Sequence, residues 1–133
     1  MVVGKLSDAV LSALLDTLPV EFSITDEHDK VLAWNRHETR VFRRSANVLG
    51  RDVRACHPKQ SLDKVERILS EMKAGTREKA EFWIDLKVDG APEKVLIQYF
   101  ALRDGAGKFL GCLECSQKIS HIQGLSGQQR LLD

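Results

Sequence analysis

Excess charge of one sign is missing from this chain of 133 residues, in which 20 Lys and Arg side chains face 19 Asp and Glu side chains and leave a formal net charge of +1. Proteins that bind nucleic acids or anionic membranes usually carry a basic surface, so this balance argues against both partners. Apolar runs of about 18 residues, long enough to span a bilayer, are missing too. The first residues also lack the charged and apolar regions of a signal peptide. We therefore expect a protein that binds neither nucleic acid nor membrane.

Cysteine is also scarce, with only Cys56, Cys112 and Cys115. An odd number this small provides no paired disulfide framework, so we expect a reducing, cytoplasmic location. Cys112 and Cys115 have the C-x-x-C spacing of metal sites, but residues three apart on a strand point to opposite faces and cannot share an ion. The motifs G-x-S-x-G, H-E-x-x-H and the Walker A loop are missing as well. We predict a protein that is not an enzyme and has no metal site.

The residues that are present predict one globular domain. Hydrophobic residues make up 43% of the chain and charged residues 29%, which is typical of folded rather than disordered proteins. We expect helices over 7–18 and 61–75, short helical pieces at 38–42 and 48–53, and strands over 20–25, 30–34, 80–88, 95–102 and 109–119. Strands at both ends with helices between them predict an α+β fold, in which one antiparallel sheet has helices on one face.

The first predicted helix has a broad apolar stripe. Its members recur at helical spacing, and they are Val10, Leu11, Leu14, Leu15 and Leu18. We expect part of this stripe to pack on the outer face of the sheet, against Phe22, Ile24, Leu113 and Cys115, and a second subunit to bury the rest. The expected organisation is a flanking dimerisation helix over 1–18, a domain over 19–122, and a linker toward a further domain over 123–133.

Several segments resemble a PAS domain, the small sensor module of signalling proteins. They are Leu18 to Asp26, Lys30 to Asn35, Val48 to Val53, Leu102 to Gly111, and Gln117 to Ser120. Their order and spacing are similar to the family's opening and closing motifs, with Lys118 in place of the usual Asp. The run from Val48 to Pro58 is also similar to PAS modules of bacterial and archaeal proteins that carry a hemerythrin-like region.

The resemblance implies a five-stranded antiparallel sheet in the order 2-1-5-4-3, with helices over one face that enclose a ligand pocket. It does not imply covalent flavin chemistry, because Val53 stands where the light-sensing branch has its reactive Cys. With strand alternation, it implies a set of ligand-binding residues: Ser23, Thr25, Cys56, His57, Ile97, Tyr99, Cys112, Glu114 and Ser116. Buried polar groups need partners, which either a small polar ligand or waters and neighbouring side chains would supply.

Cys56 and His57 fall in the segment that would cover this pocket. A thiolate or imidazole there would suit a haem iron. The alternative is that Cys56 is a small core residue and that His57 faces solvent or bonds to the backbone. Arg43 and Arg44 form a short basic patch that we interpret as solvent-exposed surface.

Taken together, these features predict a sensory or regulatory module of a larger bacterial or archaeal protein. It would act through ligand-linked or redox-linked conformational change and homodimerisation. Two alternatives remain open at this point, a ligandless dimerisation scaffold and a haem-dependent gas or redox sensor. The cofactor is unknown, with no cofactor or a small polar ligand preferred over haem.

Overall fold

Five antiparallel strands form one sheet in the order β2-β1-β5-β4-β3, which confirms the predicted topology. The structure is a computed structural model and describes residues 3–132. The elements are α1 (Asp8–Thr17), β1 (Glu21–Asp26), β2 (Val31–Trp34), the 3-10 helices η1 (Ala46–Val48), η2 (Val53–Cys56) and η3 (Lys59–Ser61), α2 (Leu62–Lys73), β3 (Lys79–Val88), β4 (Ala91–Arg103), β5 (Phe109–Lys118) and α3 (Ser120–Gln123). Among the described helices, none is long and apolar enough to cross a membrane.

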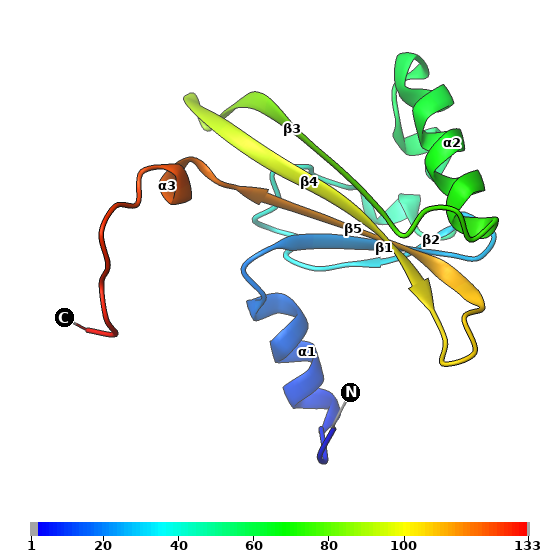
Figure 1. Cartoon of the computed structure of the whole chain (residues 1–133), viewed down its shortest axis with the longest axis horizontal. Coiled ribbons are helices and arrows are strands. Elements are labelled where there is room, and N and C mark those ends of the chain that lie inside the picture. The colour runs from blue at the N-terminus through cyan, green and yellow to red at the C-terminus, as the bar shows by residue number, and fades with distance from the viewer. Residues whose placement is uncertain (1–2, 133) are drawn as a thin grey trace.

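The hairpin of β3 and β4 is longer than the sequence pattern predicts. Asp89 and Gly90 both have positive φ angles, of 50° and 81°, as a two-residue type I′ turn requires. This turn places Val88 opposite Ala91, so β4 begins to pair with β3 at Ala91 rather than at Val95. Figure 1 shows the hairpin extending past the other strands at one end of the sheet.

Helix α2 covers one face of the sheet (Figure 1). Its residues Leu69 and Met72 are buried against Val53 and Cys112, which come from η2 and β5. Met72 is completely buried, and truncating such a side chain usually costs about 2–5 kcal/mol. This contact holds α2 and η2 over the central strands.

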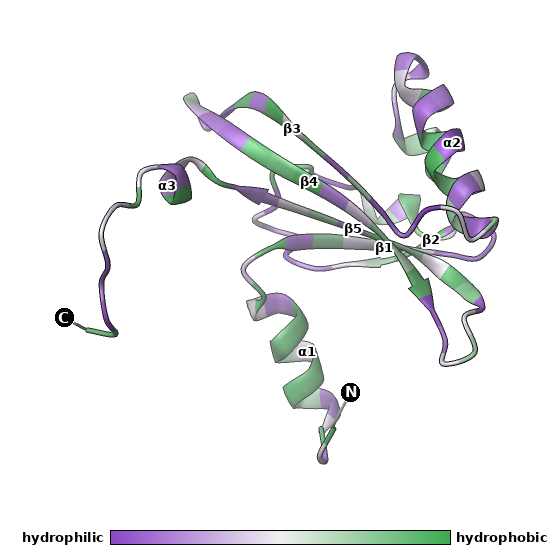
Figure 2. Cartoon of the chain, in the orientation of Figure 1, coloured by the Kyte–Doolittle hydropathy of each residue, from purple (hydrophilic) through white to green (hydrophobic). Residues whose placement is uncertain are grey.

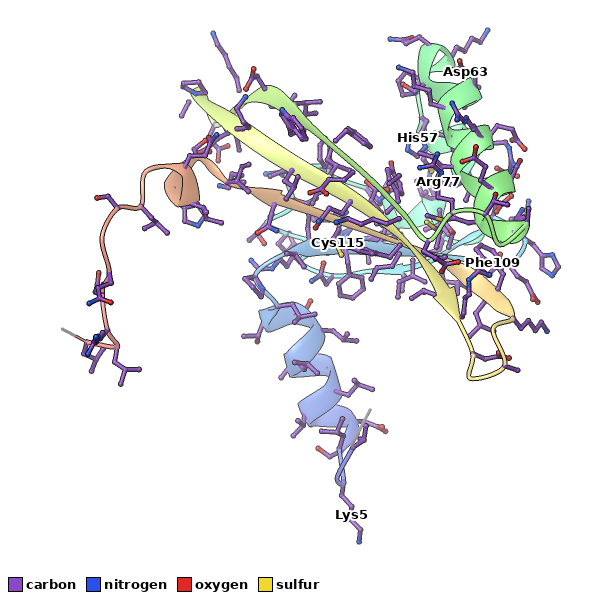
Figure 3. All side chains as sticks on the ribbon, viewed as in Figure 1. Lys5, His57, Asp63, Arg77, Phe109 and Cys115 are labelled. Carbon is purple, nitrogen blue, oxygen red and sulfur yellow. The ribbon has the colours of Figure 1, made fainter. Side chains whose placement is uncertain are left out.

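Helix α1 lies on no face of the sheet, and the expected packing against Phe22, Ile24, Leu113 and Cys115 is wrong. Val10, Leu11, Leu14 and Leu15 are 38–53% exposed. Figure 2 shows the apolar side of the helix without a covering element, and Figure 3 shows it projecting to Lys5 away from the sheet. The helix is held at its end instead, where the Asn35 side-chain amide donates to the Leu15 carbonyl at 2.7 Å.

The segment between β2 and η1 is irregular, although the sequence predicts a helical piece at 38–42. The amides of Val41 and Phe42 donate to the two carboxylate oxygens of Glu21, at 2.7 Å and 3.1 Å. These amides are therefore satisfied by a side chain from β1 rather than by helical carbonyls. The helical piece expected at 48–53 is replaced by η1 and η2 on either side of it.

Candidate functional site

A cavity of about 780 Å³ lies between the sheet and the covering segments. Its lining residues are Val41, Phe42, Arg43, Arg44, Cys56, His57, Pro58, Ser61, Lys64, Val65, Ile68, Phe82, Ile97, Tyr99 and Glu114. A second, narrow chamber of about 30 Å³ shares several of these walls and adds Ser23, Thr25, Val31, Val53, Leu69 and Cys112. The chamber has room for one or two water molecules, whereas the larger cavity has room for a small organic molecule.

A polar row crosses three strands at the wall between the two cavities. In the sheet register Ser23 of β1 lies opposite Glu114 of β5, and Glu114 lies opposite Tyr99 of β4. Directly opposed residues on adjacent strands point to the same face. The register therefore places a hydroxyl, a carboxylate and a phenol side by side on the face that α2 covers.

Arg44 joins this row from the irregular segment. Its Nε donates to Ser23 Oγ at 3.2 Å, and its Nη2 lies 3.7 Å from Glu114 Oε2, with side-chain exposures of 12% and 16%. This separation is an ion pair but too long for a hydrogen bond. Within residues 3–132, the Glu114 carboxylate accepts no hydrogen bond and the Nη groups of Arg44 donate none. Both groups thus retain hydrogen-bonding capacity at the cavity wall.

A second pair, Arg40 and Glu21, lies directly behind the first. Both residues are buried, and Arg40 Nη2 lies 3.3 Å from Glu21 Oε2. The other Arg40 nitrogens donate to the carbonyls of Phe42, Phe22 and Asn35 at 2.9–3.0 Å. Burial lowers the pKa of the Arg40 guanidinium, and the charge of Glu21 opposes this effect. This second pair is saturated with protein partners.

Thr25 contributes an unpartnered hydroxyl to the inner chamber. The residue is 7% exposed, and its Oγ1 has no hydrogen-bond partner among the described residues. An unpaired buried hydroxyl costs about 1–3 kcal/mol. The chamber therefore favours an occupant that can hydrogen-bond to Thr25.

His57 and Tyr99 close the other side of the site. His57 Nδ1 lies 3.0 Å from the Val53 carbonyl, which can only accept, so this nitrogen carries a proton. His57 Nε2 lies 3.5 Å from the Tyr99 hydroxyl, and Figure 3 shows the residue beside α2. Burial, and then the charge of Glu114, raises the pKa of Tyr99, so the phenol stays protonated and can donate.

Cys112 and Cys115 are poor nucleophiles at neutral pH. Burial, and then the charge of Glu114, raises the pKa of Cys112 to about 12. The same two causes raise the pKa of Cys115. Both lie on β5 three residues apart, so a regular strand turns them to opposite faces. In the part of the chain that the structure describes, no three His, Cys, Asp or Glu side chains gather as metal ligands.

Ion pairs tie the cover of the cavity to the sheet. Asp29, in the turn between β1 and β2, lies 3.0 Å from Arg54 Nη1 and 2.7 Å from Lys73 Nζ. Arg54 Nε also donates to Glu66 at 2.6 Å, and this contact chiefly raises the pKa of Arg54. The contacts connect η2, and α2 at Glu66 and at its C-terminal Lys73, to one turn of the sheet.

Most of the residues that the sequence predicts for this site do line the two cavities. The exception is Ser116, which is buried but lines neither of them. His57 bonds to the backbone, as one of its two interpretations expects. The interpretation of Arg44 as solvent-exposed surface is wrong, because its side chain is only 12% exposed. No pattern in the sequence distinguishes Arg44 from its exposed neighbour Arg43.

The strand order, the covering helices and the ligand-sized cavity between them define the class of the protein, an α+β module with a pocket on one face of its sheet. The model of the PAS domain family matches residues 11–120, so the chain belongs to the PAS family. PAS domains are signal-sensing modules, found for example in sensor kinases. Comparison with curated protein sequences finds no relative of the chain.

Solved structures with this fold include domains from several bacteria. A C-terminal domain from Streptococcus mutans is 32% identical, with 92% of each chain covered and a TM-score of 0.83. The PAS domain of Bordetella pertussis BvgS is 20% identical, over 84% of this chain and 85% of that one, with a TM-score of 0.63. A sensory box sensor histidine kinase from Vibrio cholerae is 17% identical, over 90% and 92%, with a TM-score of 0.55. The latter two are similar in fold.

Proposed function

We propose that this PAS domain binds a small molecule in the larger cavity and that binding changes the state of helix α1. The observation that carries this proposal is the Arg44–Glu114 pair, which lines a cavity of about 780 Å³ and has unused hydrogen-bonding groups. The volume falls within the range of about 300–1,000 Å³ that is common for ligand pockets. A bound molecule would satisfy these groups, which favours the occupied state.

A continuous set of hydrogen bonds supports the link from the cavity to α1. Arg44 and Arg40 both donate to Ser23 Oγ, at 3.2 Å and 3.3 Å. Arg40 also donates to the Asn35 carbonyl at 3.0 Å, and Asn35 holds the Leu15 carbonyl of α1. A ligand that draws Arg44 away from Ser23 would leave Ser23 Oγ to Arg40 alone and thereby alter the hydrogen bond that Arg40 makes with it. Such a ligand shifts the conformational equilibrium only by the difference in its affinity for the two states.

We infer that α1 pairs with a second copy of the chain to form a homodimer. Its apolar stripe of Val10, Leu11, Leu14 and Leu15 remains 38–53% exposed, and a self-complementary helix contact is a common way to bury such a surface. The domain would then regulate a longer bacterial or archaeal signalling protein through this contact. The sensor histidine kinase neighbour from Vibrio cholerae supports that setting.

Light scattering tests the dimer and its coupling to the cavity. Leu14→Glu should give a monomer, because a charge enters the apolar stripe, whereas Leu125→Glu, at an exposed tail position, should leave the dimer intact. Arg44→Met should change the dimer dissociation constant, and the exposed control Arg51→Met should not. A monomeric wild-type protein at high concentration would contradict the dimer. Equal dissociation constants for Arg44→Met and the wild type would contradict the coupling.

Denaturing freshly purified protein and analysing the released molecules by mass spectrometry tests ligand binding. We expect a colourless organic molecule in a fixed ratio to protein. An absorption spectrum separates the alternatives: a Soret band that disappears in His57→Ala would support a haem sensor, and a band near about 450 nm would support flavin. The absence of any released molecule, together with a dimer that responds to no cavity variant, would favour the ligandless scaffold.

A further inference from the structure

We propose that the ligand is an uncharged molecule with a flat apolar body and a head group that places a hydrogen-bond acceptor beside a donor, as a primary amide or a lactam does. This inference rests on the proposed function and adds the chemical class of the ligand. It follows from the charges of Arg44 and Glu114, from their unpaired hydrogen-bond donors and acceptors, and from the apolar residues that line the larger cavity.

Arg44 and Glu114 are the charged side chains of the cavity wall that are largely shielded from solvent, and their charges balance, whereas Arg43 and Lys64, which also line the cavity, are exposed. Arg44 Nη2 and Glu114 Oε2 are 3.7 Å apart, and the pair behind them, Arg40 and Glu21, is also balanced. A ligand carboxylate that binds Arg44 would lie beside the Glu114 carboxylate, and a ligand ammonium on Glu114 would lie beside the Arg44 guanidinium. Like charges at this distance repel strongly in a partly buried site. The site therefore favours a head group without net charge.

The unpaired donors of Arg44 and the unpaired acceptors of Glu114 are best satisfied by a ligand that carries an acceptor beside a donor. Arg44 offers only donors and Glu114 offers only acceptors. Among residues 3–132, the Nη donors of Arg44 and the carboxylate oxygens of Glu114 make no hydrogen bond. An amide meets both needs at once, because its oxygen accepts from Arg44 while its N–H donates to Glu114. A hydrocarbon would bury the Nη donors of Arg44 and the carboxylate oxygens of Glu114 without hydrogen-bond partners, which is unfavourable.

The remaining walls suit a flat apolar body. Phe82 and Tyr99 stack with ring centroids 5.8 Å apart and an interplanar angle of 25°, and Phe42, Val65 and Ile68 complete an apolar surface. Parallel aromatic rings favour an aromatic or planar ligand in an offset stack. Beyond the polar row, the chamber of about 30 Å³ accepts only a small substituent, and the unpartnered Thr25 hydroxyl favours a polar one.

A matched series of probes tests the class on the wild-type protein, with chemical-shift changes measured by NMR. The probes are benzamide, N,N-dimethylbenzamide, benzoate, benzylammonium and phenylalanine. Benzamide should bind at least about tenfold more tightly than N,N-dimethylbenzamide, which lacks the N–H donor. It should also bind more tightly than the anion, the cation and the zwitterion. Equal binding of the two amides, or a preference for any charged probe, would overturn the class.

A double variant tests the two residues without leaving a lone buried charge. Arg44→Met combined with Glu114→Leu should abolish the preference for benzamide over N,N-dimethylbenzamide. Ser116→Ala, which removes a buried hydroxyl outside the cavity, should retain it. A folded double variant that keeps the full preference would show that other groups select the ligand, and would overturn the assignment.

The experiments distinguish an error in the proposed chemical class of the ligand from an error in the proposed function. Probes that bind without the benzamide preference overturn the class but leave a working cavity. If no probe binds, the molecule released from purified protein decides: a neutral amide-like compound supports the class, and a charged or purely hydrocarbon compound overturns it. No binding by any probe and no released molecule would overturn the proposed function itself.

Discussion

Two Arg–Glu pairs lie on either side of Ser23, and they differ in how many partners the protein gives them. Arg40 and Glu21 are 5% and 7% exposed, and backbone carbonyls and amides surround both groups. Arg44 and Glu114 are 12% and 16% exposed, and among residues 3–132 their side chains make polar contacts with only Ser23 and each other. The same two residue types thus form a structural pair where backbone groups supply most of the hydrogen bonds, and a pair that is able to bind a ligand where it lines a cavity.

The largest effect is expected from breaking the saturated pair. Arg40→Met leaves the Glu21 carboxylate buried without its counter-charge and removes the donors to three carbonyls, so it should lower the free energy of unfolding by about 3–5 kcal/mol. Urea denaturation monitored by circular dichroism measures this change. Arg51→Met, at an exposed position, should stay within about 0.5 kcal/mol of the wild type. A loss below about 1 kcal/mol in Arg40→Met would contradict the structural role of the pair.

The second test replaces each whole pair with apolar residues. Arg44→Met with Glu114→Leu should leave the free energy of unfolding unchanged or raise it by up to about 4 kcal/mol, because few hydrogen bonds are lost with the charges. Arg40→Met with Glu21→Leu should lower it, since the amides of Val41 and Phe42 lose their acceptors at about 1–3 kcal/mol each. The same denaturation experiment applies to both. Equal losses in the two double variants would show that the pairs do not differ.

A smaller effect separates two hydroxyls on β1. Ser23→Ala removes the acceptor for both arginines and should cost about 1–3 kcal/mol. Thr25→Val keeps the shape of the side chain and removes a hydroxyl that has no partner among the described residues, so the ligand-free protein should be unchanged or slightly more stable. Thermal and urea unfolding of the two variants provide the comparison. A cost in Thr25→Val equal to that in Ser23→Ala would show that the Thr25 hydroxyl is paired in solution.

The last test concerns the buried thiol of Cys112, which lines the inner chamber, at alkaline pH. Burial raises the pKa of Cys112 to about 12, whereas an unfolded thiol ionises near about 8.5. Between these values the unfolded state releases a proton that the folded state keeps, so stability falls as the pH rises, and the contribution is complete below about pH 8.5. Cys112→Ala should therefore show a shallower loss of stability above that pH. Ser116→Ala should keep the wild-type slope, and identical slopes for all three proteins would contradict the burial of the Cys112 thiol.

Much of the fold is predictable because turns and strand alternation are local properties. Asp89 and Gly90 specify a two-residue turn wherever the strands go, and Pro19 ends the first helix in any environment. Alternation along β1 and β5 likewise predicts that Ser23, Thr25 and Glu114 share one face, and the cavity lining includes all three. Ser116 follows the same alternation but lines neither cavity, although its partner Ile97 on β4 does, because alternation specifies a face and not which residues on it border a cavity.

The sequence by itself therefore determined the five strands, the two longer helices, their order along the chain and the face on which each strand residue lies. Only the tertiary structure decided that Arg44 reaches the cavity and that Arg40 does not. Both lie in a segment without periodicity, whose path depends on Glu21 of a distant strand accepting the amides of Val41 and Phe42. The tertiary structure also decided the exposed position of α1, because an apolar stripe specifies that a helix needs a partner but not which surface supplies it. Long-range hydrogen bonds and packing have no local signature in the chain, and they place the residues that give this domain its site.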